Sequence, residues 1–248
     1  MSSMDNSSLD KLIKAHPELS DELNSVANEY TMTLRRLTHE IGNALTLINC
    51  SLQIIESSHP EVSDFKYWNS TIEDVNYLKN MLSELSLFNN STNISLSATE
   101  LVSLTANVIE SFSSLSSVRN HNITFVFNAS SNSIIIDADS TKLKQALINI
   151  IKNAIEAMSA VESSGVITVS ITEENNNVII AVTDTGCGIS PKHIEDIFKP
   201  MITYKSSGTG LGLPICAKII GSHGGNILVS SIPDKGSTFT IELPAKIE

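Results

Sequence analysis

The first third of the chain carries two long stripes of apolar residues with helical spacing, separated by one short break. The first stripe lies in a helix expected over residues 22–57 and consists of Leu34, Leu37, Ile41, Leu45, Ile48, Leu52 and Ile55. The second stripe consists of Phe65, Trp68, Ile72, Val75, Leu78, Leu82 and Leu85. Residues three or four apart share one face of a helix, so each stripe predicts an amphipathic helix. Pro60 cannot continue a helix, and the break therefore predicts an antiparallel hairpin.

A single hairpin leaves part of both stripes exposed to water, which costs free energy. Pairing two hairpins into a four-helix bundle covers these residues. We therefore expect residues 21–90 to form a helical hairpin that dimerises with a second copy of the chain. The polar residues 1–20 are expected to form a flexible N-terminal segment.

Beyond a polar linker expected over residues 91–98, the pattern changes to short strands interspersed with helices. Strands are expected at 123–127, 134–137, 166–172, 178–184, 226–231 and 238–243, and helices at 100–117, 141–158 and 211–222. This order predicts an α/β sandwich over residues 99–248, in which helices cover one face of a mixed sheet. The fold class expected for the whole chain is therefore α+β.

The composition argues against several classes of protein. The 248 residues carry a formal net charge of −11, which disfavours binding to nucleic acid or to anionic membrane surfaces. No stretch approaches the roughly 20 apolar residues of a membrane helix, and the first residues lack a signal-peptide pattern. We therefore expect no membrane insertion and a cytoplasmic location. The three cysteines are too widely spaced to suggest a metal site or a disulfide framework.

One histidine on the first expected helix has neighbours suited to phosphoryl chemistry. In the repeat set by Leu34 and Ile41, His39 falls on the side away from the apolar stripe and should face solvent. An exposed imidazole can act as a nucleophile, and the adjacent Glu40 can accept its ring proton or fix its tautomer. Asn43 lies four residues after His39 on the same face, where its amide can orient a water molecule. An ordinary solvated His–Glu pair fits this segment as well.

Two asparagines lie four residues apart on the helix expected at 141–158. The buried side of this helix is formed by Leu143, Leu147, Ile150, Ala154 and Met158. Asn149 and Asn153 project together from the opposite side. Two amide oxygens suit Mg²⁺, which takes few protein ligands and keeps several waters. A plain polar helix face is the alternative interpretation.

A carboxylate ends the strand expected at 178–184 and is followed by a Gly-x-Gly turn. Buried at this position, Asp184 can accept a hydrogen bond from an exocyclic amine such as that of adenine. Gly186 and Gly188 carry no side chain and would let a ring approach the backbone. A tight turn explains the two glycines but not the carboxylate at the strand end, so both interpretations stay open.

A second glycine-rich segment leads directly into the helix expected at 211–222. Gly208, Gly210 and Gly212 alternate with other residues there, and backbone N–H groups at a helix start can bind an anion. The segment is not a P-loop, because the Gly-Lys-Ser/Thr ending is missing. The preceding residues 199–207 are polar and suited to closing over phosphates, and Lys205 within them can contact a terminal phosphate.

The order of these motifs resembles that of the sensor histidine kinases of two-component systems. A His-Glu-x-x-Asn helix, two asparagines on a second helix, Asp-x-Gly-x-Gly, Phe-x-Pro and Gly-x-Gly-x-Gly follow one another at family-like spacings. The resemblance covers nearly the whole chain. It implies a histidine-bearing dimeric hairpin followed by an ATP-binding domain of the Bergerat type.

The resemblance implies a role for each motif residue. His39 would be the phosphoacceptor, Glu40 its acid/base helper, and Asn43 the residue used to dephosphorylate the partner. ATP and Mg²⁺ would bind the C-terminal domain, with Asn153 as the main Mg²⁺ ligand and Asn149 beside it. The remaining residues expected at the nucleotide are Asp184, which would read the adenine amine, and Gly186, Gly188, Lys205, Gly208, Gly210, Gly212 and Thr238.

Three positions depart from the usual family pattern, and a fourth separates the chain from related ATPases. Ala44 replaces a proline common after the histidine motif, and Met201 and Tyr204 replace a Phe and a Thr common in the lid over the nucleotide. Related ATPases of this fold place a catalytic Glu where this chain has Asn149. The absence of that Glu favours a kinase that spares ATP from water over a hydrolysing ATPase.

The function predicted is that of a histidine kinase, which autophosphorylates His39 from ATP and passes the phosphoryl group to an aspartate of a response regulator receiver domain. It would also act as the phosphatase of that regulator.

The first alternative is a phosphotransfer or phosphatase module with little ATP-dependent autokinase activity. A serine-directed kinase or chaperone-type ATPase lacks the His-Glu-x-x-Asn helix, and a dimeric scaffold that uses nucleotide as a switch is the non-enzyme alternative. Too few residues precede the first stripe for a folded sensor domain, so the stimulus is expected to come from an upstream sensor protein or from a further part of a longer chain.

Overall fold

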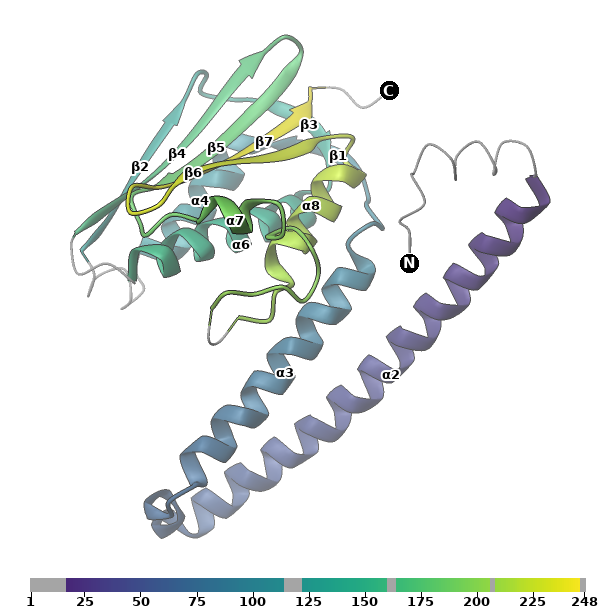
Figure 1. Ribbon diagram of the computed structural model, residues 1–248, viewed down its shortest axis with the longest axis vertical. Coiled ribbons are helices and arrows are strands. Elements are labelled where there is room, and N and C mark those ends of the chain that lie inside the picture. The colour runs from purple at the N-terminus through teal and green to yellow at the C-terminus, as the bar shows by residue number, and fades with distance from the viewer. Residues whose placement is uncertain (1–16, 114–121, 160–163, 206–207, 246–248) are drawn as a thin grey trace. The chain divides into compact units, whose positions relative to one another are not determined.

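The computed structural model describes residues 17–113, 122–159, 164–205 and 208–245, and the chain divides into two compact units, Met1–Asn89 and Asn90–Glu248 (Figure 1). The long helix α2 (Pro17–Ser58) of the first unit begins with a proline, which the first turn tolerates because its N–H has no intrahelical partner. The flexible segment expected over residues 1–20 is therefore corrected at residues 17–20, which are helical. Its remainder, residues 1–16, lies outside the described residues.

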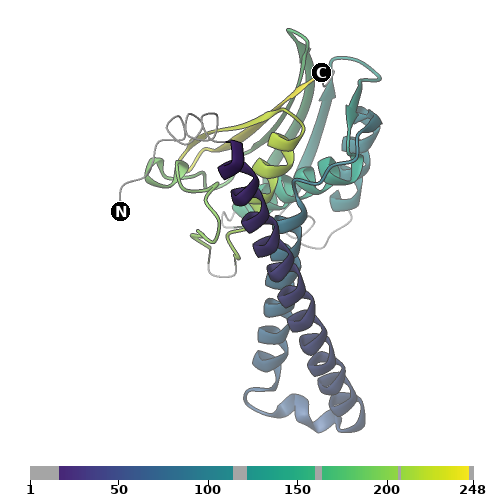
Figure 2. The same ribbon diagram turned by 90° about the vertical axis from the view of Figure 1, so that its right-hand side faces the viewer.

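The first unit is the helical hairpin expected from the sequence. Helix α3 (Trp68–Asn90) runs antiparallel to α2, and the short 3-10 helix η1 (Pro60–Asp64) lies between them (Figure 2). Among the described residues of this unit, the buried side chains are Thr38, Leu45, Val62 and Val75. The hydroxyl of Thr38 donates to the carbonyl oxygen of Leu34 at 2.7 Å, so burial leaves it with a partner.

The apolar stripe expected on α2 is divided into a buried line and an exposed line. Leu45 keeps only 8% of its surface exposed, whereas Leu37, Ile41, Ile48 and Ile55 keep 48%, 49%, 47% and 41%. The reason is geometric, because a stripe this wide spans more of the helix surface than one neighbouring helix can cover. We call Leu37, Ile41, Ile48 and Ile55 the outer line of α2.

The second unit contains a five-stranded sheet in the order β2-β4-β5-β7-β6. Its strands are β2 (Ile123–Ala129), β4 (Gly165–Glu174), β5 (Asn177–Asp184), β6 (Asn226–Ile232) and β7 (Gly236–Pro244). β2 and β4 are parallel and the other neighbouring pairs are antiparallel, so the sheet is mixed. Helices α4 (Leu101–Ser113), α6 (Ser140–Ser159) and α8 (Gly212–Ser222) lie on one face of it (Figure 1). The predicted α+β fold with a helix-covered mixed sheet is confirmed.

Two features of the second unit, strand β1 and helix α7, differ from the sequence expectation. A two-stranded sheet pairs β1 (Ser97–Glu100) with β3 (Ile135–Ala138), so the last two residues of the linker expected at 91–98 belong to a strand. Helix α4 is described through Ser113, and the end expected for it near residue 117 lies outside the described residues. A short helix, α7 (Pro191–Ile194), precedes the glycine-rich segment.

Alternate residues of the central strands form the core beneath the helices. Ile167 of β4 and Ile180 of β5 are at most 1% exposed, as is Ile150 of α6. Each side chain buried in this way stabilises the fold by about 1.5–3 kcal/mol. The intervening residues face away from the helices, where the hydroxyls of Thr183 and Thr238 meet at 3.0 Å. Within the described ranges, no helix has the length and apolarity needed to cross a bilayer.

Candidate active site

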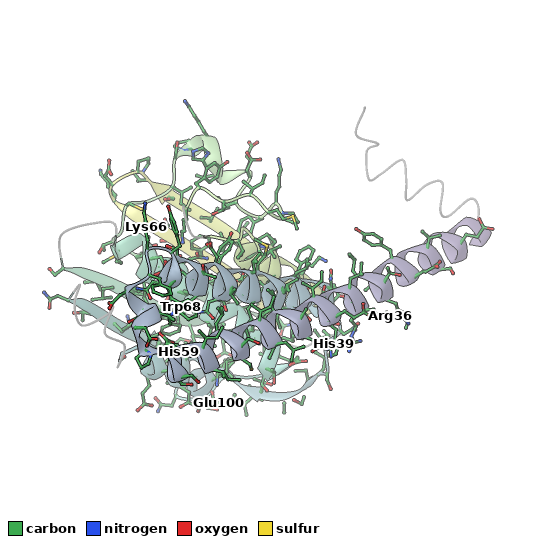
Figure 3. The ribbon with its side chains drawn as sticks, turned by 90° about the horizontal axis from the view of Figure 1, so that it is seen from below. Arg36, His39, His59, Lys66, Trp68 and Glu100 are labelled. Atoms are coloured by element: carbon green, nitrogen blue, oxygen red, sulfur yellow. The ribbon has the colours of Figure 1, made fainter. Side chains whose placement is uncertain are left out.

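His39 lies exposed on α2 (Figure 3). The amide nitrogen of Asn43 is 3.2 Å from Nδ1 of its imidazole ring. With this orientation the amide donates to Nδ1, and with the amide turned over its oxygen would accept from a protonated Nδ1. In either arrangement Asn43 engages Nδ1. The other ring nitrogen, Nε2, makes no hydrogen bond to the residues that the structure describes. The Nε2 atom is therefore the ring nitrogen left to react.

Glu40 is exposed on α2 beside His39. No hydrogen bond joins the two side chains within the described part of the hairpin. Successive residues of a helix point about 100° apart, so neighbours in sequence do not face each other. The acid/base role expected for Glu40 stays a prediction.

In the second unit, Asp184 ends strand β5 and is only 3% exposed. Its Oδ1 atom accepts hydrogen bonds from the backbone N–H groups of Gly186 at 2.8 Å and Ser237 at 3.3 Å. Burial raises the pKa of Asp184, and the two N–H donors and the charge of Lys205 oppose this rise. Because both donors contact Oδ1, the second oxygen, Oδ2, has no hydrogen bond to the described residues. It can accept one from the amine of a ligand.

The Gly-x-Gly turn after β5 packs against α6. The N–H of Cys187 donates to the carbonyl oxygen of Ala157 at 3.2 Å. A Cβ atom at Gly186 would come within 2.7 Å of the Ala157 backbone, and Gly188 has a φ of +66°, which favours glycine. Both glycines are thus required by the packing of the turn itself. Their expected role in admitting the adenine ring stays a prediction.

The structure places Thr238 on the other face of the sheet from Asp184, and its expected role near the adenine stays a prediction. Thr238 pairs with Thr183, and its hydroxyl lies on the sheet face opposite the helices, whereas Asp184 faces the helices. Ser237, one residue earlier, is 5% exposed and is the residue whose N–H reaches Asp184. Its hydroxyl is 3.0 Å from that of Ser231 on β6. Since side chains alternate between faces along a strand, Ser237 is the β7 side chain at this site.

One line of residues on α6 contacts the glycine-rich segment, Lys205 and the Gly-x-Gly turn. The side-chain nitrogen of Asn149 donates to the carbonyl oxygen of Gly212 at 3.2 Å. One turn later, Oδ1 of Asn153 accepts from the ammonium of Lys205 at 2.8 Å. Another turn on, Ala157 holds the Gly-x-Gly turn through its carbonyl oxygen. The spacing of four residues therefore explains how motifs far apart in sequence converge on one helix face.

The glycine-rich segment is folded back on the residues before it. The N–H of Met201 donates to the carbonyl oxygen of Gly210 at 3.0 Å, and Gly210 has a φ of +71°. A Cβ atom at Gly208 would lie 2.4 Å from the hydroxyl of Thr203, whereas one at Gly212 would have no neighbour closer than 4.0 Å. The lack of room for a Cβ atom at Gly208 and the positive φ of Gly210 explain these two glycines, but neither constraint applies to Gly212. The expected contact of all three with phosphates stays a prediction.

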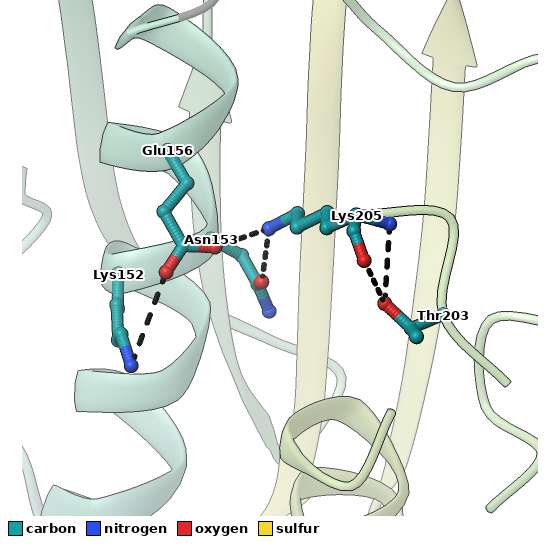
Figure 4. Close-up of polar contacts among 5 residues, drawn as sticks. All are labelled: Lys152, Asn153, Glu156, Thr203 and Lys205. Atoms are coloured by element: carbon teal, nitrogen blue, oxygen red, sulfur yellow. Dashed lines mark hydrogen bonds and ion pairs between the residues drawn. The ribbon is translucent and has the colours of Figure 1, made fainter. Parts of the chain in front are cut away.

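Lys205 extends from the segment between α7 and α8 to α6 (Figure 4). Its Nζ atom is 2.8 Å from Oδ1 of Asn153 and 2.5 Å from Oε2 of Glu156, and Glu156 also lies 3.9 Å from Nζ of Lys152. The sequence led us to expect Lys205 at a terminal phosphate, which stays a prediction. Its contact with Glu156 was not foreseen. That contact joins residues 49 positions apart, which no local pattern encodes.

Fold and site together define a nucleotide-binding α/β sandwich joined to a histidine-bearing hairpin, and known proteins share these features. The profile of the family described as histidine kinase-, DNA gyrase B- and HSP90-like ATPases matches residues 138–247. Sporulation kinase C of Bacillus subtilis (strain 168) is 32% identical over 239 residues, which is 96% of this chain and 54% of that protein. The chain thus spans about half the length of this curated relative.

Solved structures agree with this assignment. The catalytic domain of the histidine kinase ThkA is 35% identical with a TM-score of 0.55, and the match covers 61% of this chain and 97% of that one. ThkA in complex with the response regulator protein TrrA is 28% identical with a TM-score of 0.62, covering 94% of this chain and 66% of the other. The chain belongs to the histidine kinase family.

Proposed function

We propose that the chain is an ATP-dependent protein-histidine kinase that autophosphorylates His39. The observation that carries this proposal is the pairing of two sites in one chain. One is an exposed imidazole that has Nδ1 engaged by Asn43 and Nε2 without a bond to the described residues. The other is the buried Asp184, whose Oδ2 can accept from an amine. Family membership adds that chains of this kind carry an ATPase domain.

ATP is the substrate that the second unit suits best. Asp184 would bind the exocyclic amine of adenine through Oδ2, and an acceptor fixed by two backbone N–H groups needs no rearrangement to do so. The residues also fit Mg²⁺, because Oδ1 of Asn153 already faces a cation, the ammonium of Lys205. Asn153 would hold the ion, with Asn149 oriented beside it by Gly212. When bound, Mg²⁺ neutralises charge on phosphate oxygens.

The reaction at His39 is a phosphoryl transfer. The lone pair of Nε2 forms a bond to the γ-phosphorus of ATP while the bond from that phosphorus to the bridging oxygen of ADP breaks. The ring is deprotonated at the attacking nitrogen, which the amide of Asn43 favours if its oxygen accepts from Nδ1–H. Catalysis then rests on positioning and on neutralisation of charge.

Onward transfer to an aspartate of a response regulator receiver domain is the next step of the proposal. ThkA, which is 28% identical in that structure, was crystallised with a response regulator protein. The same surface would allow dephosphorylation of the regulator, since Asn43 lies beside His39 and can orient a water molecule.

The proposal also covers the association and location of the chain. It includes a homodimer formed through the outer line of α2, an upstream sensor partner and a cytoplasmic location.

Incubation with ATP labelled at the γ-phosphate tests the proposed function. The wild-type chain should acquire a label that acid removes, because phosphohistidine is acid-labile, and His39→Gln should acquire none. His59→Gln is the matched control, since His59 is also an exposed histidine of the hairpin and should label normally. Asp184→Ala should label poorly because the adenine site is lost. Equal labelling of the wild type and both the His39→Gln and Asp184→Ala variants would contradict the proposal.

A further inference from the structure

We propose that Lys205 and Glu156 form a latch that competes with the metal-bound nucleotide for Asn153. The ammonium of Lys205 takes the place of the cation on the Asn153 oxygen, and it must leave that oxygen before the cation can bind. The inference rests on the proposed function, because Asn153 is a metal ligand only if the second unit binds ATP with Mg²⁺.

The contacts of the Lys205 ammonium are those of a cation site on α6. It lies 2.8 Å from Oδ1 of Asn153 and 2.5 Å from Oε2 of Glu156, three residues further along the same helix (Figure 4). A divalent ion binds an oxygen at about 2.1 Å, and two cations crowded onto one amide oxygen repel each other. Occupation of Asn153 by Lys205 and by Mg²⁺ is therefore mutually exclusive.

A second contact gives the latched segment a defined position. The ring of Tyr204 stacks on that of His193 on α7, with 3.6 Å between ring centroids and 32° between ring planes. The backbone N–H of Lys205 also donates to the hydroxyl of Thr203 at 3.2 Å. The segment is thus held on two elements at once, at α7 through Tyr204 and at α6 through Lys205. Its resting position is a specific arrangement rather than one loose contact.

The exposure of the latch sets its strength. The side chains of Lys205 and Glu156 are 44% and 40% exposed, so water screens their attraction. Ion pairs at such positions shift an equilibrium by about two- to fivefold. A latch of this strength tunes the affinity for nucleotide and leaves the site able to open.

Replacing Glu156 tests the latch without touching the residues proposed to hold the nucleotide. We expect Glu156→Gln to lower the Kd for the Mg²⁺ complex of a non-hydrolysable ATP analogue by about two- to fivefold, measured by calorimetry. Glu174→Gln is the control, because Glu174 is an exposed carboxylate at the end of β4 and its loss should leave the Kd unchanged. An unchanged Kd in Glu156→Gln would overturn the latch. A raised Kd would overturn it too, since Glu156 would then help to hold the cation.

Trypsin cleavage after Lys205 tests the same contact in the absence of nucleotide. The protease must take the lysine side chain into its own pocket, so a latched Lys205 is cleaved more slowly. We expect Glu156→Gln to be cleaved there about two- to fivefold faster than the wild type and the Glu174→Gln control. Equal rates would overturn the latch. This readout needs no nucleotide, whereas a wild-type chain that fails to bind the analogue would overturn the proposed function instead.

Discussion

Ser237 and Thr238 are neighbours on β7, yet only Ser237 lies on the face of the sheet that carries Asp184. Successive residues of a strand point to opposite faces of the sheet. A role assigned to the wrong one of two neighbours is therefore assigned to the wrong face. The apolar residues Phe239, Ile241 and Leu243 alternate on β7 and are all buried. Their alternation places Ser237 on the buried face and Thr238 on the other, and this was the signal in the sequence that could have located the site residue.

Substitution of each of the two residues should separate their roles. Ser237→Ala removes a hydroxyl that contacts Ser231, which in turn accepts from the N–H of Ile189 at 2.8 Å in the turn after Asp184. We expect the Kd for ATP to rise by about two- to tenfold, the effect of one lost hydrogen bond. Thr238→Val, on the opposite face, should leave the Kd unchanged. Calorimetry measures the Kd of both variants. An equal rise in Kd for Ser237→Ala and Thr238→Val would contradict the assignment of the site to the face of β7 that carries Ser237.

Among the elements, helix α4 depends on a carboxylate at its N-terminus. The Glu100 carboxylate accepts from the N–H groups of Val102 at 3.0 Å, Ser103 at 2.6 Å and Ile134 at 3.1 Å. Burial alone would raise the pKa of Glu100, but the hydrogen bonds from Ser103, Ile134 and Val102 outweigh it and lower the pKa to about 2. The charged carboxylate therefore stabilises both the start of α4 and the chain entering β3.

This capping interaction predicts a specific pH dependence of stability. A carboxyl group whose pKa is lowered by folding contributes fully above its unfolded pKa, and the contribution is lost as the pH falls toward its folded pKa. Glu100→Gln should therefore lower the free energy of unfolding by about 1 kcal/mol at neutral pH. Chemical denaturation at a series of pH values should show this difference shrinking below about pH 4.5. Glu110→Gln on the exposed side of α4 is the control, and a difference that is constant with pH would contradict the assignment.

Helix α8 ends at Ser222 and is followed by a histidine with a structural role. His223 is 1% exposed, and its ring binds the carbonyl oxygen of Ile219 through Nδ1 at 2.7 Å. Its Nε2 atom accepts from the N–H of Asp139, the residue before α6, at 3.0 Å. Both ring nitrogens are therefore occupied, the neutral tautomer with the proton on Nδ1 is fixed, and the end of α8 is joined to the start of α6.

At the scale of the whole molecule, the parts predicted well were those with a local pattern. The run of β-branched residues over 178–184 predicted β5, and the step of four between Asn149 and Asn153 predicted their shared face of α6. Strand β1 was missed because its four residues carry no apolar alternation and its pairing partner lies some 40 positions away, beyond any local pattern. The contact of Lys205 with Glu156 was missed for the same reason.

The outer line of α2 predicts how the whole molecule associates. Four aliphatic side chains with nearly half their surface in water favour pairing with a second hairpin. Replacing both Ile41 and Ile48 with Glu would bury two unpaired charges in that interface. We therefore expect the dissociation constant of the dimer to rise by at least about tenfold. Ile54→Glu, which alters an exposed residue on another side of α2, is the control and should leave the dimer intact.

Sedimentation analysis measures this association directly. The wild-type chain and Ile54→Glu should sediment as dimers of the 26.8 kDa chain, and the double Ile41→Glu, Ile48→Glu variant as a monomer at the same concentration. A wild-type chain that is monomeric throughout the accessible concentration range would contradict the proposed homodimer. So would a double variant that dimerises as tightly as the wild type.

The central claim is that His39 receives the phosphoryl group, and locating that group tests it most directly. The full chain is incubated with ATP and Mg²⁺, digested at mildly alkaline pH, where phosphohistidine survives, and its fragments are sequenced by tandem mass spectrometry. The account predicts one phosphoryl group, on the imidazole of His39, and its loss after brief acid treatment. A phosphoryl group on another residue, one that survives acid, or none at all after prolonged incubation would contradict it.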